Sequence, residues 1–150
     1  MERETAALSP GHAALAGAAA ATVWAAAEPL DQRVFRLAYS DIALLGKAVT
    51  RGPGWRAAGL ALHAANGAAA GLVFRAVDRR IGGSRRRNAV AFALVEHLAL
   101  YPLTVLTDRF HPARGAPDLP PLARSGRAFA QATFRHALFG LVLGRLTETD

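Results

Sequence analysis

The sequence predicts an all-α integral membrane protein, a four-helix bundle that forms a single membrane domain over its 150 residues. Three observations lead to this fold class: four long stretches almost without charge, an arginine-rich link between the second and third of them, and proline and glycine at their ends. A helix needs about 20 apolar residues to cross a bilayer, with a range of roughly 17 to 25. The expected spans are 9–27, 56–77, 88–107 and 127–146.

The ends of the predicted helices follow from their flanking residues. Ser9 is a suitable N-cap for a helix that starts at Pro10, and this helix is expected to stop before Pro29 because proline cannot continue the hydrogen-bond ladder. After it, residues 34–50 place apolar side chains at helical spacing with charges between them, which predicts a short amphipathic helix at the membrane interface. Pro102 should kink the third span near its end.

The arginines indicate how the chain is oriented. Cytoplasmic loops are enriched in arginine and lysine, so the link between the second and third spans is placed on the cytoplasmic side. Four spans then put both termini there as well. The net charge of +7 arises largely from the arginines of this link, which the topology explains. No nucleic-acid partner is therefore expected. Anionic lipids are the expected partners of the link arginines Arg79, Arg80, Arg85, Arg86 and Arg87.

The composition favours a bacterial source. Seventeen arginines stand beside a single lysine, and alanine, glycine and proline are in excess, which is typical of a GC-rich bacterial genome. The first apolar stretch is long and the residues before it carry no net positive charge, so it is interpreted as a span rather than a cleaved signal peptide. The predicted location is the bacterial inner (cytoplasmic) membrane, with cytoplasmic N- and C-termini.

A shift of 73 positions aligns part of the chain with itself. HAANGAAAG at 63–71 then matches HALFGLVLG at 136–144, and both contain the pattern H-A-x-x-G-x-x-x-G. The sequence therefore predicts an internal repeat of 1–77 and 78–150. Each half would be a two-helix hairpin, and both halves would run in the same direction through the membrane.

Small residues form stripes along two of the predicted spans. The expected packing positions are Gly59, Gly67, Gly71, Gly140 and Gly144. Within each stripe, these glycines and one histidine, His63 or His136, follow one another at intervals of four residues. Membrane helices associate closely through such small residues. A structural or interaction subunit that packs through these seams is the leading expectation, with a homo-oligomer or a larger membrane complex as its context.

A polar cluster is expected near the middle of the bilayer. Its members are His63, Asn66, Glu96, His97, Arg135 and His136. At 1.5 Å per residue, three of them (His63, Glu96 and His136) lie roughly 10 to 13 Å inside their spans. An isolated charge there costs at least about 2.5 kcal/mol, so Glu96 and Arg135 should pair with each other or face a polar cavity.

Three interpretations of this cluster stay open. It is a structural network of an ion pair and interhelical hydrogen bonds, a metal or haem site, or a path for protons or a small solute. The candidate ligands for the metal or haem site are His63, Glu96, His97 and His136. Near the outer rim, Glu28, Asp31, Asp41, Asp108 and His111 are expected to gather in interfacial ion pairs, and Trp24, Trp55 and Tyr101 are suited to anchoring at the interface.

The sequence gives no sign of catalysis. Cysteine is absent, which excludes disulfides, thiolate nucleophiles and cysteine metal sites. It contains no glycine-rich phosphate loop, nucleophile elbow or HExxH motif. No catalytic residue and no cofactor is therefore assigned, and an enzyme is not the favoured class.

Three segments, ATVWAAAEPLDQRVF, HAANGAAAG and FRHALFGLVLG, carry a resemblance. They resemble small uncharacterised bacterial inner-membrane proteins, mostly actinobacterial, in the neighbourhood of the YagU-like family. The resemblance implies a multi-span membrane protein and supplies neither an activity nor catalytic residues. A soluble alanine-rich helical bundle is the remaining alternative, because most of the apolar residues are alanine, a weak hydrophobe.

Overall fold

The computed structural model describes residues 8–148, and within them every regular element is helical. The elements are α1 (Pro10–Phe35), α2 (Asp41–Val49), α3 (Trp55–Ile81), α4 (Arg85–Leu100), a 3₁₀ turn (Tyr101–Leu103), α5 (Thr104–Phe110) and α6 (Gly126–Thr147). The all-α prediction is confirmed for this part of the chain. The expected break at Pro102 is the 3₁₀ turn, which separates α4 from α5.

Serine residues define where four of the helices begin. The side-chain oxygens of Ser9, Ser40, Ser84 and Ser125 accept a backbone N–H from the first turn of α1, α2, α4 and α6. Such caps satisfy backbone donors that have no partner inside the helix. The predicted start of the first span at Ser9 and the predicted fourth span at 127–146 agree with α1 and α6 to within a residue or two.

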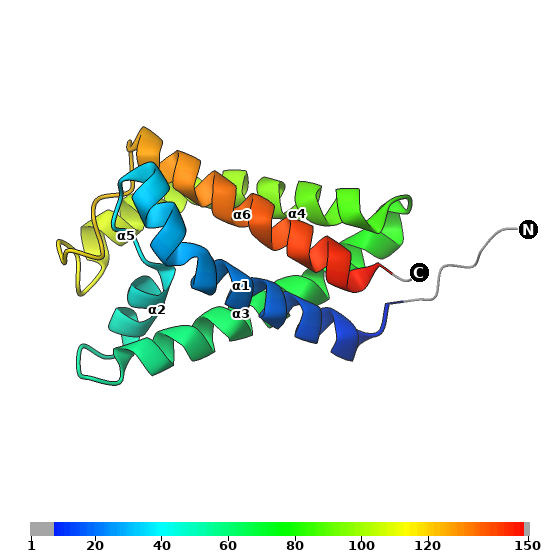
Figure 1. The fold of residues 1–150 in the computed structure, drawn as a ribbon, viewed down its shortest axis with the longest axis horizontal. Helices are drawn as coiled ribbons and strands as arrows, with labels where there is room; N and C mark the ends of the chain where they lie inside the picture. The colour runs from blue at the N-terminus through cyan, green and yellow to red at the C-terminus, as the bar shows by residue number, and fades with distance from the viewer. Residues whose placement is uncertain (1–7, 149–150) are drawn as a thin grey trace, which may run out of the picture.

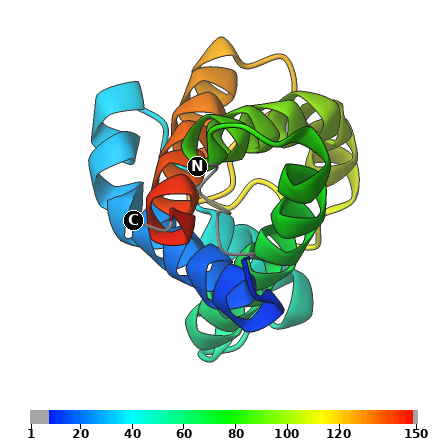
Figure 2. The same ribbon diagram turned by 90° about the vertical axis from the view of Figure 1, so that its right-hand side faces the viewer.

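The long helices α1, α3, α4 and α6 run along the length of the molecule, and α2 and α5 lie at one end (Figure 1). α1 packs against both α3 and α6, and α4 packs against α6. The start of α1, the end of α6 and the link between α3 and α4 lie together at the opposite end, which faces the viewer in Figure 2. The two described ends of the chain therefore share one side with the arginine-rich link.

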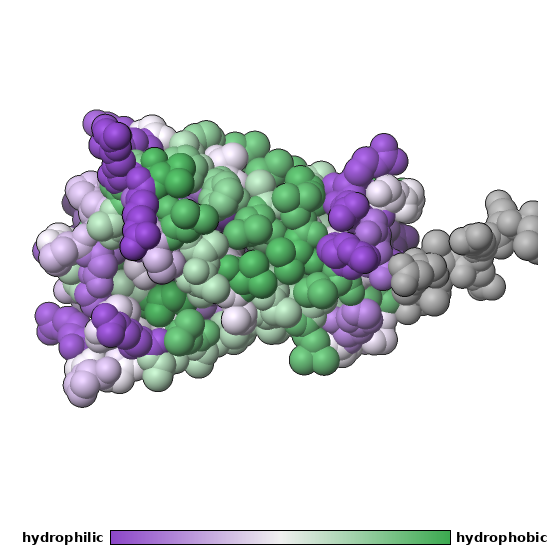
Figure 3. Space-filling view, in the orientation of Figure 1, coloured by the Kyte–Doolittle hydropathy of each residue, from purple (hydrophilic) through white to green (hydrophobic). Residues whose placement is uncertain are grey.

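An apolar belt crosses the middle of the face shown in Figure 3, between two hydrophilic ends. Three helical segments are long and apolar enough to cross a membrane: Pro10–Phe35, Trp55–Ile81 and Arg85–Phe110. The third joins α4, the 3₁₀ turn and α5, and it exposes large apolar side chains such as Val95, Leu98 and Phe110. α6 is not among the three, since Gln131, Arg135 and His136 make it more polar.

The end of α1 and the start of α2 differ from the sequence prediction. α1 does not stop before Pro29 but continues to Phe35. Buried Glu28 and Asp31 hold this last part in place through side-chain hydrogen bonds to other segments, which offsets the cost of an internal proline, about 3 kcal/mol. The amphipathic helix expected over 34–50 is limited to α2, because the chain leaves α1 at Arg36 in a left-handed conformation and stays extended up to Ser40.

Glycines bring α1 and α3 into backbone contact. A Cβ atom on Gly17 would collide with the carbonyl group of Gly67, and one on Gly71 would collide with the carbonyl group of Ala13. Gly59, further along the same stripe, packs α3 against α2 instead. Only residues without a side chain permit so close an approach, and van der Waals contact of this kind is what holds membrane helices together.

α4 and α6 meet in the same manner. A Cβ atom on Gly140 would lie 2.7 Å from Cα of Val90, and one on Gly144 would lie 2.9 Å from Cα of Arg86. Each of these four positions comes 73 residues after its counterpart in the contact between α1 and α3. All five predicted packing glycines therefore lie in helix contacts within the chain.

Candidate functional site

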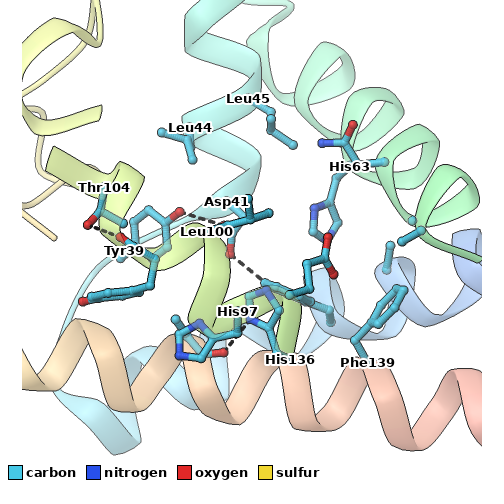
Figure 4. A pocket seen from close by; sticks show the side chains of 18 of the residues that line it. Tyr39, Asp41, Leu44, Leu45, His63, His97, Leu100, Thr104, His136 and Phe139 are labelled. Atoms are coloured by element: carbon cyan, nitrogen blue, oxygen red, sulfur yellow. Dashed lines mark hydrogen bonds between the residues drawn. The ribbon is translucent and has the colours of Figure 1, made fainter. Parts of the chain in front are cut away.

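A cavity of about 320 Å³ lies between α3 and α4, and side chains from α1, α2 and α6 complete its walls (Figure 4). It begins where the two helices separate, beyond the contacting rings of Phe74 and Phe92, whose centroids are 5.7 Å apart. Small-molecule pockets in proteins have volumes of roughly 300–1,000 Å³. The cavity is therefore large enough for a small organic molecule.

The three histidines expected at mid-depth converge on this cavity. Trp24 of α1 lies between two of them, with ring centroids 5.2 Å from His63 and 4.8 Å from His136. His97 lies 4.8 Å from His136 on the other side, and Figure 4 shows these two rings close together. His63 of α3, His97 of α4 and His136 of α6 thus form one aromatic group with Trp24.

The imidazoles differ in their hydrogen bonds. Nε2 of His97 bonds with the hydroxyl of Thr133 at 2.9 Å, and Nδ1 of His136 bonds with the carbonyl oxygen of Ala132 at 2.8 Å. Nε2 of His63 is buried and has no hydrogen-bond partner among the described residues. Part of the polar capacity of the cluster is therefore unused.

The other predicted members of the cluster separate into two places. Asn66 and Glu96 line the cavity together with the histidines. Arg135 does not line it but is fully buried behind the wall, so Glu96 and Arg135 do not pair, and Glu96 instead faces the cavity, which was the other expectation. α4 directs Glu96 into the cavity, whereas α6 directs Arg135 away from it. The spacing of residues in the sequence does not specify these directions.

Arg135 binds three carboxylates that come from the first part of the chain. Its guanidinium donates from Nε and Nη2 to Asp31, at 2.6 and 2.7 Å, and from Nη1 to Asp41 at 2.6 Å. Glu28 lies 3.7 Å from Nη1. The two bonds to Asp31 use the planar fork that distinguishes arginine from lysine. This cluster ties α6 to α1 and to the start of α2.

Asp41 connects the arginine cluster to the cavity wall. Its carboxylate accepts from Nε1 of Trp24 at 3.0 Å and from the hydroxyl of Tyr39 at 2.7 Å, besides its bond to Arg135. Burial alone would raise the pKa of Asp41, but the charge of Arg135 and the hydrogen bond from Tyr39 outweigh it and hold the pKa below its ordinary value. Burial and the neighbouring Asp41 charge raise the pKa of Tyr39 well above its ordinary value. Asp41 is thus an ionised and fully bonded part of the wall.

The prediction of an acidic group at the outer rim is met in part. Glu28, Asp31 and Asp41 do gather, but around Arg135 of α6. Asp108 accepts backbone N–H groups of residues 122 and 123 instead, and His111 bonds with the carbonyl oxygen of Leu44. Neither contact is an ion pair.

Trp24 is the site residue that sequence reasoning assigned to a different place. It was expected to anchor at the interface, yet it is buried at the centre of the histidine group. One signal pointed to its real position, since Trp24 comes three residues before the predicted end of its span and 73 residues before His97. Trp24 meets His63 edge-on, at an interplanar angle of 76°, and at the corresponding positions the rings of His97 and His136 are also in contact, tilted at 36°.

The arrangement does not suit a metal ion. Within residues 8–148, no group of three or more histidine, cysteine, aspartate or glutamate side chains is placed to hold one. The metal interpretation of His63, Glu96, His97 and His136 therefore gains no support. The walls offer instead apolar contact, aromatic faces and a few polar groups, which is the character of a binding pocket for a small organic molecule.

Comparisons with protein-family models, with curated proteins and with solved structures found no match to this chain.

Proposed function

We propose that this chain is an integral membrane protein that crosses the bilayer four times and binds a small molecule in the cavity between α3 and α4. The observation that carries the proposal is the cavity itself: about 320 Å³, lined by histidine, asparagine and glutamate side chains on helices whose outer faces are apolar. Polar groups in membrane helices are costly and usually serve a ligand or transport pathway.

Membrane insertion is supported by the apolar belt and the three long apolar helices. We assign α6 as the fourth span because it runs beside α1 and α4 over a similar length. Its charged centre would be tolerated in lipid because Arg135 is fully buried and paired. The arginine-rich link would then lie on the cytoplasmic side of a bacterial inner membrane, in reach of anionic lipids.

Ligand binding accounts for the geometry better than the two other roles considered. A subunit that joins partners through its glycine seams needs those seams free, whereas Gly67, Gly71, Gly140 and Gly144 contact helices of the same chain. An open conduction path needs a way past Phe74 and Phe92, where close-packed side chains close the cavity toward the link. An enclosed site with one open side is left.

An internal duplication is part of the proposal. It is supported by contacts that recur after 73 residues, both at the glycine seams and in the ring contacts of Trp24 with His63 and of His97 with His136. The halves would be related by a pseudo-twofold axis along the membrane normal. The cavity would then lie on one of two equivalent helix interfaces, between α3 and α4, while the other, between α1 and α6, is closed.

Labelling of single cysteines tests the four-span topology directly, because the chain contains no cysteine of its own. Pro53→Cys and Arg114→Cys should react with a membrane-impermeant maleimide added outside intact cells. Arg80→Cys and Arg145→Cys should react only after the membrane is permeabilised, since an odd number of spans separates them from the first pair. Reaction of Arg145→Cys together with Arg114→Cys in intact cells would show that α6 does not cross.

Filling the cavity tests the binding site. In a Trp55→Phe background, Trp24 is the one remaining tryptophan, and its fluorescence should be quenched saturably by trichloroethanol, a small neutral quencher. Ala132→Phe places a ring in the cavity and should abolish the saturable phase. Ala130→Phe, two residues away on an exposed face of α6, is the matched control and should retain it. Quenching that stays linear with concentration in all three proteins would contradict a binding site at Trp24.

A further inference from the structure

Glu96 is the unexplained charge in the cavity. It lies near the middle of the apolar segment Arg85–Phe110, is half-buried and lines the cavity. Its carboxylate makes no hydrogen bond or ion pair with any of residues 8–148. A carboxylate within a membrane helix normally faces a partner, and insertion scales put the cost of a charged aspartate at the helix centre at about 2.5–3.5 kcal/mol.

The cavity wall is acidic overall. Its carboxylates are those of Asp41 and Glu96, and within the described chain no lysine or arginine lines it. Asp41 is already matched by Arg135, Tyr39 and Trp24, so the negative charge without a counterpart belongs to Glu96. Attraction between opposite charges grows as the surroundings become less polar, which favours a positively charged guest over a neutral or negative one.

We propose that the cavity binds an organic monocation with an apolar body, such as a quaternary ammonium compound, with its positive charge at Glu96. This inference rests on the proposed binding function and names the ligand class. A metal cation fits poorly, because no group of three ligating side chains is placed to coordinate one among residues 8–148. An organic cation needs no such ligands.

The rest of the wall matches such a molecule. Leu44, Leu45 and Leu100 supply apolar contact, and the rings of Trp24 and Tyr101 supply aromatic surface. A cation over an aromatic ring gains about 0.5–1 kcal/mol at exposed sites and about 2 or more where water is excluded. The carboxylate of Glu96 and the aromatic rings would thus hold the positive charge. The apolar body of the cation would cover the leucine side chains of the cavity wall.

The open side of the cavity points to entry from the lipid. The ion pair between Arg135 and Asp31 joins α6 to α1. The positions 73 residues away from these two are Leu62 of α3 and Thr104 of α5, and they do not bond to each other. α3 and α4 contact each other little beyond the region near their link. A lipid-soluble cation could therefore reach Glu96 sideways, between α3 and the segment of α4 and α5, without leaving the membrane.

The decisive experiment compares two competitors of the same shape. Benzyltrimethylammonium carries a positive charge, and neopentylbenzene has carbon in place of its nitrogen. Both are tested for relief of trichloroethanol quenching of Trp24 in the Trp55→Phe protein. We expect the cation to displace the quencher at a concentration at least about tenfold lower than its neutral counterpart does, a difference of roughly 1.4 kcal/mol.

The Glu96→Gln variant should remove that preference, so that both competitors act at similar concentrations, and Glu96→Asp, which keeps the charge, should restore most of it. Because Glu96 has no partner among the described residues, its neutralisation breaks no contact and should not lower the melting temperature. Equal displacement by the two competitors in the wild-type cavity would overturn the cation proposal and leave the binding function intact. Absence of saturable quenching by trichloroethanol would instead overturn the binding function itself.

Discussion

Arg135→Leu is expected to lower the free energy of unfolding by about 3–5 kcal/mol, the cost of breaking a buried ion pair by removing one partner. Arg135 is fully buried, and its guanidinium makes charged contacts with Asp31 and Asp41 at 2.6 to 2.7 Å. Leucine would fill similar space while leaving the carboxylates of Glu28, Asp31 and Asp41 without their counter-charge. The expected fall in melting temperature in detergent is roughly 6–20 °C, at about 2–4 °C per kcal/mol for a chain of this size.

Two controls separate charge from packing. Arg145→Leu changes an exposed arginine in the last turn of the same helix and should shift the melting temperature little. Arg135→Lys keeps the charge but loses the forked contact with Asp31, so an intermediate loss is expected. If Arg135→Leu unfolds at the same temperature as Arg145→Leu, the cluster does not stabilise the fold.

A double variant tests whether the stability is lost because a buried carboxylate is left unpaired. Asp31→Asn together with Arg135→Leu removes the carboxylate that receives two of the guanidinium bonds, so it should recover part of the stability lost in Arg135→Leu alone. The reason is that most of the loss comes from leaving a buried charge unpaired, not from losing the attraction itself. Simple addition of the two single losses would contradict this account.

The helices were predictable because local signals define them. The long apolar stretch placed α6 within a residue at each end, and the spacing of glycine and histidine placed the three histidines on helices that converge. Pro29 misled the prediction, because its effect on α1 is local while the contacts that extend α1, through Glu28 and Asp31, come from residues far along the chain.

The ion pairs were not predictable in the same way. Arg135 and Asp31 are separated by 104 positions, and no pattern of spacing links them. Glu96 was the nearest carboxylate by estimated depth, but depth does not specify rotation about the helix axis. The orientation of α6 relative to α1 is decided by packing at many small residues, so only the three-dimensional structure reveals which carboxylate Arg135 meets.

Gly17→Val should separate α1 from α3. A Cβ atom at Gly17 would already collide with the carbonyl group of Gly67, and valine adds two methyl groups to it. Because the obstacle is backbone, no side-chain movement relieves the collision, and the helices must move apart or tilt. Overpacking of this kind costs about 1–3 kcal/mol and sometimes more, and a value at the upper end is expected because the whole seam would lose contact.

Gly11→Val provides the matched control, since it makes the same exchange in the same helix where no described atom lies within 4 Å of the new Cβ. Its melting temperature should stay close to that of the wild type. Gly140→Val extends the test to the contact between α4 and α6, where the nearest atom is Cα of Val90 at 2.7 Å. If the two seams are equivalent halves of a repeat, both seam variants should destabilise the protein to a similar degree. A Gly17→Val protein as stable as Gly11→Val would mean that α1 and α3 are not held together by backbone contact.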